Sequence, residues 1–498
     1  MTNSSENRWE GTYFGGPCIG NVPYSFEVSY NQAQIGGYSS STKIKTDPEV
    51  GDHVLFFRQI EEECQITLGK TFRVRSPVDV IDNNLSDGEC GTAEESEAAG
   101  ACTLRAAVMQ ANVSPGHERI EVGRGTYELT LEGDEAEDAA NAAIGDLDIT
   151  DSATITGDLS GPRRVTIDAG GRSRIFDIHT SVDDHPVVRL SGLRLTNGRE
   201  SNFPGGAIWN RGSLQVRRVV IEGNQLSGGE GTCAASFSQF PCNRGAGILN
   251  QGALLLSEST ISDNQTGEGG TSGHAGALSN FGERAIAYIE KSLIVRNRSR
   301  YFSALQNYLG SMDIVNTTIT GNVEHGGSVI SNQGGQILIR HSTLALNTTT
   351  GGRVPLLGNR DVTSDSSTFV GTFRVAGSLI ETRNDLLLCG GNVISGGFNV
   401  IRPAGRSGNI GLCSFSGLSS SDHIASEFLS FSLDDNGGPT ETIGINASGD
   451  FRYIDLGSLY CPTEDQRGAI RPVDGDEDGS AHCDPGAFEY NPAGFVRR

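Results

Sequence analysis

The chain has very little lysine and no long apolar run. Only four of its 38 basic residues are lysines, at positions 43, 45, 70 and 291, so a lysine-dependent mechanism has few candidates. No run of about 18 apolar residues occurs, which excludes a membrane-spanning helix. The first residues also lack the charged-then-apolar layout of a signal peptide. We therefore expect no transmembrane segment, and export either after removal of a signal or by another route.

Basic charge is scarce as well, and proline is not enriched alongside the abundant glycine. The net charge of −23 repels phosphate backbones, so nucleic acid is not an expected partner. The 67 glycines come with only 16 prolines and no G-X-Y period, which excludes collagen. A length of 498 residues allows two to four domains.

Cysteine pairs of the CxxC type are also missing, which removes support for a structural zinc site or a thioredoxin-like site. The ten cysteines form an even set, and sequential neighbours enclose plausible loops. We expect five disulfides and an extracellular or cell-surface location, because disulfides persist in oxidising compartments. The alternative is a cytosolic protein with buried thiols. The expected pairs are Cys18–Cys64, Cys90–Cys102, Cys233–Cys242, Cys389–Cys413 and Cys461–Cys483.

An internal repeat occupies the chain from about residue 145 to 380. Each unit has two asparagines 14 to 17 residues apart, and short runs rich in β-branched and other apolar residues alternate with Gly or Asn. Units of about 25–30 residues with short strands and no helical period are typical of a parallel β-helix coil. We therefore predict an all-β fold, a single-stranded right-handed parallel β-helix.

The repeated asparagines have a structural explanation. Asparagine tolerates left-handed backbone angles and hydrogen-bonds its own turn, so we expect stacked ladders at the corners of the coils. The predicted ladder at the first corner comprises Asn250, Asn280, Asn307 and Asn332.

The two ends of the predicted rod need covers, because an open sheet edge invites further pairing. Residues 102–112 carry a helical apolar stripe, which predicts a short N-terminal capping helix. We expect four regions: a small β module of unknown role at 1–75, the N-terminal cap at 76–142, the β-helix coils at 143–385 and a C-terminal cap at 386–498.

These segments resemble a known group of proteins. Cys102-Thr-Leu-Arg-Ala-Ala-Val108 is similar to the C-S-L-R-E-A-I motif of many bacterial surface β-helix proteins, with Thr103, Ala106 and Val108 in place of Ser, Glu and Ile. Coils such as GGAIWN…IEGN resemble those of the same group and, more distantly, those of polymorphic outer-membrane proteins.

The C-terminal motifs resemble the ending of choice-of-anchor Q proteins, and they occur in the same order. They are Leu433-Asp-Asp-Asn-Gly-Gly-Pro-Thr440, Asp455-Leu-Gly457, Asp465-Gln-Arg-Gly468 and Cys483-Asp-Pro-Gly-Ala-Phe-Glu489. The resemblance covers about residues 72 to 490. It implies an exported, often surface-attached protein, but no settled activity, because fold alone does not fix function.

One local motif predicts a structural Ca²⁺ site. Asp474, Asp476 and Asp478, followed by Gly479, match the front half of a calcium-binding loop, in which alternate oxygen donors wrap around the ion. The position that would supply a bidentate Glu is Pro485. The alternative is a solvated acidic turn. Nothing in the sequence indicates an organic cofactor.

A column of polar residues appears when the coils are aligned on their second asparagine. The column consists of the residues six positions before the second asparagine of each coil, which are Arg218, Glu258, Lys291, Asn316 and His341. Neighbouring strands lie about 4.8 Å apart, so these side chains are expected to line one strand face. One interpretation is a solvent-facing charge ladder. The other is a saccharide-binding groove, in which Lys291 or His341 removes a proton and Arg218 neutralises a uronate.

The sequence thus favours a secreted or cell-surface β-helix protein with a structural, adhesive or glycan-contacting role. The expected partner is a polysaccharide or a cell-surface glycan. The alternative is a polysaccharide lyase acting on a uronate-containing polymer. A lyase is favoured over a glycoside hydrolase, which needs carboxylates clustered on one face.

Overall fold

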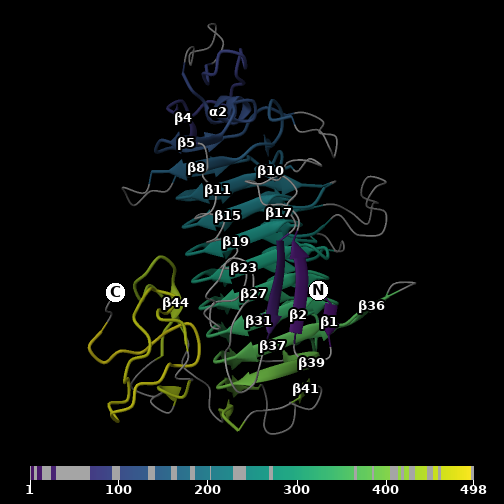
Figure 1. The fold of residues 1–498 in the computed structure, drawn as a ribbon, viewed down its shortest axis with the longest axis vertical. Coiled ribbons are helices and arrows are strands. Elements are labelled where there is room, and N and C mark those ends of the chain that lie inside the picture. Colours follow the sequence, from purple (N-terminus) through teal and green to yellow (C-terminus); the bar gives the residue numbers. More distant parts are fainter. Residues whose placement is uncertain are drawn as a thin grey trace.

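The computed structural model describes three strands within residues 2–29 and most of residues 68–494. Within the second range the description omits 92–100, 133–140, 159–164, 180–185, 202, 228–242, 268–272, 364–366, 384–385, 404–412, 417–419, 426–431, 446–452 and 458–460. The described chain forms long stacks of parallel strands, wound as an all-β parallel β-helix (Figure 1). The predicted fold class is confirmed.

Each full coil contributes one strand to each of four rows, which we name sheets I to IV in chain order. Sheet I contains β7 (Leu147–Ile149), β10 (Phe176–Ile178), β14 (Ile208–Asn210), β18 (Ile248–Asn250), β22 (Leu278–Phe281), β26 (Leu305–Tyr308), β30 (Ile330–Gln333) and β34 (Pro355–Arg360). Sheet II contains β4 (Leu68–Val74), β5 (His117–Val122), β8 (Ala153–Gly157), β11 (Val187–Ser191), β15 (Ser213–Arg217), β19 (Ala253–Ser257), β23 (Ile286–Glu290), β27 (Ser311–Val315), β31 (Gln336–Arg340), β37 (Thr372–Ala376) and β41 (Cys413–Ser416). The long strand β39 (Leu387–Gly397) pairs with β34 and β37 and so joins the two sheets.

Sheets III and IV complete each turn. Sheet III contains β6 (Thr126–Glu128), β9 (Val165–Asp168), β12 (Leu193–Thr196), β16 (Val220–Glu222), β20 (Thr260–Ser262), β24 (Leu293–Val295), β28 (Thr318–Thr320), β32 (Thr343–Ala345), β38 (Leu379–Glu381), β40 (Val400–Arg402) and β42 (His423–Ile424). Sheet IV contains β13 (Arg199–Glu200), β17 (Gln225–Leu226), β21 (Gln265–Thr266), β25 (Arg298–Ser299), β29 (Val323–Glu324) and β33 (Thr348–Thr349).

Three small antiparallel units lie outside these rows. They are the sheet of β1 (Thr2–Ser4), β2 (Arg8–Tyr13) and β3 (Tyr24–Ser29), the pair β35 (Val362–Thr363) and β36 (Thr368–Phe369), and the pair β43 (Leu433–Asp434) and β44 (Thr442–Ile443).

The core is a continuous stack of aliphatic side chains inside the coils. Strand alternation turns every second residue inward, and the parallel register places like residues above one another. In sheet II, for example, Leu190 pairs with Ile155 and Val216, and all three are fully buried or nearly so. Each such side chain contributes about 1.5–3 kcal/mol relative to full exposure.

The predicted asparagine ladders are present at two corners. Between sheets I and II each buried amide donates to the next asparagine at 2.6–2.9 Å, through Asn210, Asn250, Asn280, Asn307, Asn332 and Asn359. Between sheets III and IV a second ladder joins Asn224, Asn264, Asn297, Asn322 and Asn347 at 2.8–3.0 Å. These asparagines are structural, because their side chains satisfy buried turn groups.

The predicted capping helix is α2 (Leu104–Ala111), at one end of the rod (Figure 1). It begins at Thr103, whose hydroxyl accepts from the Ala106 amide, and its apolar stripe is buried against the first coils. Arg105 is also buried and bonds Asp79 through two nitrogens. Among the described residues, no helix is both long enough and apolar enough to span a bilayer.

Two of the expected disulfides are formed, Cys90–Cys102 and Cys461–Cys483, and Cys389 is disulfide-bonded as well. Cys18, Cys64, Cys233 and Cys242 lie outside the described residues, as does the side chain of Cys413. The cysteines that can be followed are thus oxidised, as the sequence predicts.

The coils extend beyond both expected boundaries. Strand β4 starts at residue 68 and pairs with β5, and β42 is still a coil strand at residue 424. The expected cover over the C-terminal end is wrong for residues 432–494, which lie along the side of the rod (Figure 1). The reason is hydrogen bonding, because this segment pairs its own polar groups with the coil corners of sheets II and III.

Candidate functional site

The predicted polar column lies in the turns between sheets II and III, not on a strand face as expected. Its members, Arg218, Glu258, Lys291, Asn316 and His341, all have positive φ angles of 44–54°. A residue with left-handed backbone angles ends one strand and turns the chain into the next. Each of these side chains therefore projects from the corner of a coil.

The C-terminal segment covers the second half of this column. Lys291 Nζ lies 2.5 Å from Glu464 Oε2, and Asn316 Nδ2 donates to the Glu464 carbonyl at 2.8 Å. His341 is buried, and burial, together with the charges of Arg471 and Arg340, lowers its pKa well below the ordinary value. These residues anchor a segment of their own chain, so their arrangement does not support a groove in which Lys291 or His341 acts as a base.

The first half of the column is an ion-pair ladder. Arg218 Nε lies 2.5 Å from Glu258 Oε2, and Arg217 Nη2 lies 3.0 Å from the other oxygen. Burial raises the pKa of Glu258, but the two guanidinium groups outweigh it and hold the pKa below its ordinary value. This arrangement fits the charge-ladder interpretation.

The acidic loop brings together a different set of carboxylates from the one predicted. Asp474 and Asp476 converge with Asp455, with one oxygen of each within 4.8 Å of the others, whereas Asp478 is not in this group. Asp455 also accepts the amides of Gly475 and Asp476. Asp455 was missed because it lies about 20 residues earlier in the chain.

Calcium binding by this loop stays a prediction. Asp476→Asn should reduce any calcium-induced rise in melting temperature, because it removes one of the converging charges. Glu477→Gln is the matched control, since it removes a charge from the same exposed loop without altering the converging set. Calorimetry with calcium and with chelator measures the effect, and a melting temperature indifferent to both would leave only an acidic turn.

The outer face of sheet I carries polar and aromatic side chains that the strand register brings into rows, and most of these side chains are buried. One row contains Asp148, Asp177, Trp209, Leu249, Ser279, Gln306 and Ser331. The parallel row, one residue beyond the asparagine ladder, includes Phe281, Tyr308, Gln333 and Arg360 in register. Both rows point outward because the asparagines between them point inward.

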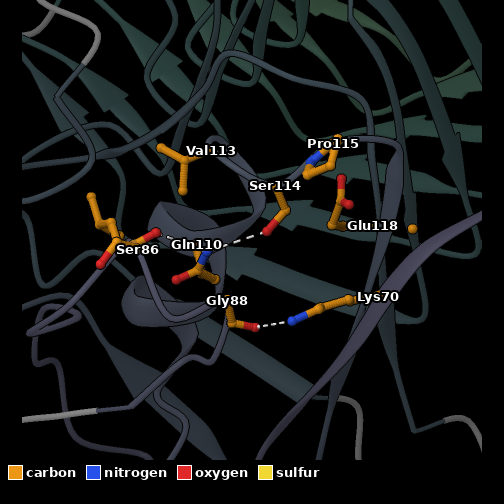
Figure 2. A pocket seen from close by; sticks show the side chains of 10 residues that line it. Lys70, Ser86, Gly88, Gln110, Val113, Ser114, Pro115 and Glu118 are labelled. Atoms are coloured by element: carbon orange, nitrogen blue, oxygen red, sulfur yellow. Dashed lines mark hydrogen bonds between the residues drawn. The ribbon is translucent and has the colours of Figure 1, made fainter.

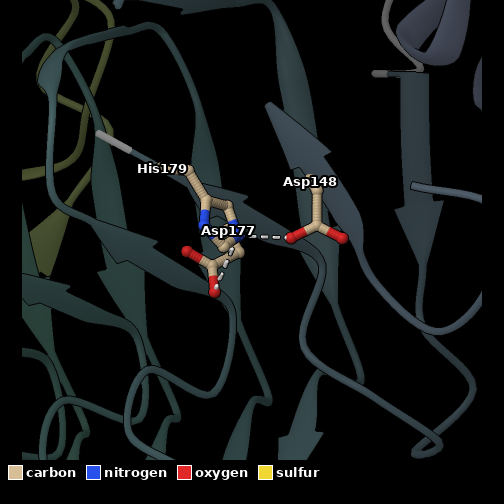
Figure 3. Close-up of side chains that lie close together, drawn as sticks. All are labelled: Asp148, Asp177 and His179. Atoms are coloured by element: carbon tan, nitrogen blue, oxygen red, sulfur yellow. Dashed lines mark hydrogen bonds and ion pairs between the residues drawn. The ribbon is translucent and has the colours of Figure 1, made fainter. Parts of the chain in front are cut away.

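At the N-terminal end of this face, His179 meets two buried carboxylates (Figure 3). His179 Nε2 lies 2.5 Å from Asp148 Oδ1 and 3.6 Å from Asp177 Oδ2. Arg211 Nη2 lies 3.0 Å from His179 Nδ1 and 2.8 Å from Asp177 Oδ1. We assign the proton to Nε2 from this network, which leaves Nδ1 as an acceptor.

Guanidinium groups neutralise Asp177 and the neighbouring Asp146. Arg174 pairs with Asp146 at 2.6 Å and with Asp177 at 3.1 Å, and the Arg211 guanidinium stacks 4.1 Å from the centre of the Trp209 ring. Asp148, Asp177 and His179 are the right ligand types for a divalent cation. Asp177 is already held by two arginines, however, so both of its oxygens are occupied by guanidinium groups instead of a metal.

Farther along the same face, a buried arginine lies beside an aromatic stack. Arg244 is 7% exposed, donates to Gln306 at 2.8 Å and lies 4.8 Å from the centre of the Phe281 ring. Phe281 and Tyr308 stack with centroids 4.8 Å apart, and the exposed Arg360 bonds Gln333 at 2.5 Å.

No carboxylate among the described residues pairs with Arg244 or Arg360, in a chain of net charge −23. Burial lowers the pKa of Arg244 to about 10, with a further contribution from the charge of Arg360. Burial and the same two arginines lower the pKa of the neighbouring His274 to about 3, so its imidazole is neutral. The local potential is therefore positive.

Sequence reasoning missed this face because the coils were aligned only on the second asparagine. Alignment on the first asparagine would have shown the residues that flank it, such as Ser279 and Phe281 around Asn280, as two outward-facing rows. Arg244 would still have been missed, because its contacts with Gln306 and Phe281 join separate coils.

Comparison with known proteins gives one structural similarity. No family model matches the chain, and no curated protein matches it by sequence. Among solved structures the chain is similar to the pectate lyase Pel9A, with 15% sequence identity and a TM-score of 0.43. The similarity covers 86% of this chain and 98% of that chain.

Proposed function

We propose that this protein is an exported β-helix protein that binds an acidic, uronate-containing polysaccharide along the outer face of sheet I. The observation that carries the proposal is the group formed by Arg244, Phe281, Tyr308 and Arg360. Neither Arg244 nor Arg360 pairs with a carboxylate among the described residues, and Arg244 lies 4.8 Å from the centre of the Phe281 ring, which stacks on Tyr308. A carboxylate-bearing chain would supply the missing negative charge.

The dimensions of the face suit an extended chain. Neighbouring coils lie about 4.8 Å apart. A straight polymer can therefore contact the half-buried Phe281 and Tyr308 and the exposed Arg360 along one row. The oxidised cysteines support an extracellular location. Structural and adhesive roles at a cell surface remain compatible with glycan binding on this face.

Arg360→Gln should weaken binding to polygalacturonate about tenfold or more, because a charge-assisted hydrogen bond contributes about 1.5–3 kcal/mol. Arg374→Gln, an exposed arginine on sheet II, is the matched control and should bind as the unaltered protein does. Isothermal titration calorimetry measures both, with dextran as the neutral polymer. Equal binding to dextran, or an unaffected Arg360→Gln variant, would contradict the proposal.

A second candidate, a polysaccharide lyase, is favoured by the position of His179 on the same face. In such a reaction Arg211 would first have to turn away from His179 Nδ1. Nδ1 would then take the C5 proton of a uronate, the C4–O4 bond would break with its electron pair leaving on oxygen, and a C4=C5 double bond would form. The departing oxygen would take a proton from solvent. Ultraviolet absorbance of the unsaturated product tests this activity, which His179→Ala should abolish. Binding without product would leave a binding protein.

A further inference from the structure

A pocket of about 460 Å³ lies at the N-terminal end of the rod, separate from the face of sheet I (Figure 2). Strand β4, the loop at 85–88, the end of α2 and the start of β5 surround it. Its volume is within the range of small-molecule sites. The residues that line it are Gly69, Lys70, Leu85, Ser86, Gly88, Gln110, Val113, Ser114, Pro115 and Glu118.

Glu118 is the unusual member of this lining. Its side chain is fully buried, and neither carboxylate oxygen has a hydrogen-bond partner. Glycine at position 69 makes room for it, because a Cβ there would lie 2.1 Å from Glu118 Oε1. A buried carboxylate without partners is costly, so its presence needs an explanation beyond packing.

The nearby cation does not neutralise Glu118. Lys70 Nζ instead donates to the Gly88 carbonyl at 2.7 Å (Figure 2). It also lies 3.9 Å from Glu89. Burial raises the pKa of Glu118 to about 7, and the charge of Asp151 adds to the rise. The nearby backbone amides of Glu118 and Lys70 partly oppose the rise in the pKa of Glu118. Neither amide is placed to form a hydrogen bond with the carboxylate.

We propose that this pocket binds a small organic ligand carrying a protonated amine, with the ammonium group against Glu118. The ammonium would donate to both unpartnered oxygens and supply the missing positive charge. The apolar part of the ligand would lie against Leu85, Val113 and Pro115, of which Leu85 and Val113 are 39% and 53% exposed.

An organic amine fits this pocket better than a metal ion. Glu118 is the only carboxylate in the lining, and it belongs to no group of three converging metal-ligand side chains among the described residues. Divalent cations bound by proteins are typically surrounded by several oxygen ligands, whereas one carboxylate suffices for an ammonium. The pocket is also much larger than one ion needs.

Calorimetric titration with two amines and their uncharged counterparts tests this proposal. The probes are phenethylamine with 2-phenylethanol, and glucosamine with glucose, at millimolar concentration and neutral pH. At least one amine should bind, and its alcohol counterpart should bind at least tenfold more weakly. Failure of both amines to bind, or equal binding of an amine and its counterpart, would overturn the proposal.

Substitution of Glu118 identifies the site. Glu118→Gln keeps the shape of the side chain and removes a buried charge, so the variant should fold and lose at least tenfold in amine affinity. Glu121→Gln is the matched control on the same strand, where the exposed side chain pairs with Arg73 at 3.0 Å. Amine binding unchanged in Glu118→Gln would also overturn the proposal. Because the proposed glycan face is elsewhere, polygalacturonate binding should not change in either variant.

Discussion

Replacement of Arg471 by methionine should destabilise the folded protein by about 3–5 kcal/mol and release the C-terminal segment from the coils. Arg471 is buried, and Nε bonds Glu489 at 2.9 Å. Its other nitrogens donate to Asn316 Oδ1 and to the carbonyls of Asp484 and Gly486. Methionine has similar length but no charge, so two buried carboxylates would lose their cation.

The loss of stability in the Arg471→Met variant should depend on pH. Burial raises the pKa of both Asp484 and Glu489, and the charge of Arg471 opposes that rise. Without Arg471 their folded-state pKa values rise further above the unfolded ones. A group with a raised folded-state pKa loses its contribution to stability as pH rises through that value. The variant should therefore be least stable at neutral and alkaline pH and partly recover in acid.

Denaturant unfolding at several pH values measures this effect, and limited proteolysis detects release of residues 432–494. Arg298→Met is the matched control, because Arg298 is an exposed coil residue on β25. If both variants were equally stable and equally resistant to protease, Arg471 would not hold the segment in place.

Glu324→Gln should lower the free energy of unfolding by about 2–4 kcal/mol, although it only replaces one carboxylate oxygen with an NH₂ group. Glu324 Oε2 accepts the Ser303 amide at 2.5 Å. Its Oε1 accepts the amides of His325, Gly326 and Gly327 at 2.8–3.1 Å. A glutamine offers one acceptor oxygen and places an NH₂ group against the remaining donors, which leaves buried amides unpaired.

Denaturant unfolding tests this cost, and hydrogen exchange at residue 303 and residues 325–327 should accelerate locally. Glu441→Gln is the control, because Glu441 is exposed and, among the described residues, only its backbone carbonyl accepts a hydrogen bond, from Gln466. Unchanged exchange at the four amides would show that the Glu324 carboxylate does not hold this turn.

The amino-acid sequence by itself determined the features that depend on local structure repeated along the chain. The asparagine ladders, the capping helix at Leu104–Ala111 and the sequential disulfides Cys90–Cys102 and Cys461–Cys483 were all predicted correctly. Each depends on residues close in sequence, or on a turn that recurs in every coil. A repeating turn places each copy above the previous one, so the pattern of one coil predicts its neighbours.

Only the tertiary structure decided where the polar groups meet. One interpretation of the sequence placed Lys291 and His341 in a saccharide groove, but residues about 120–175 positions later in the chain pack over that corner. The group at Arg244 depends on a side chain that crosses two coils to reach Gln306. Such contacts depend on how far a long side chain extends and on where a later segment folds back onto the rod. Neither feature recurs from coil to coil, so the repeat does not predict it.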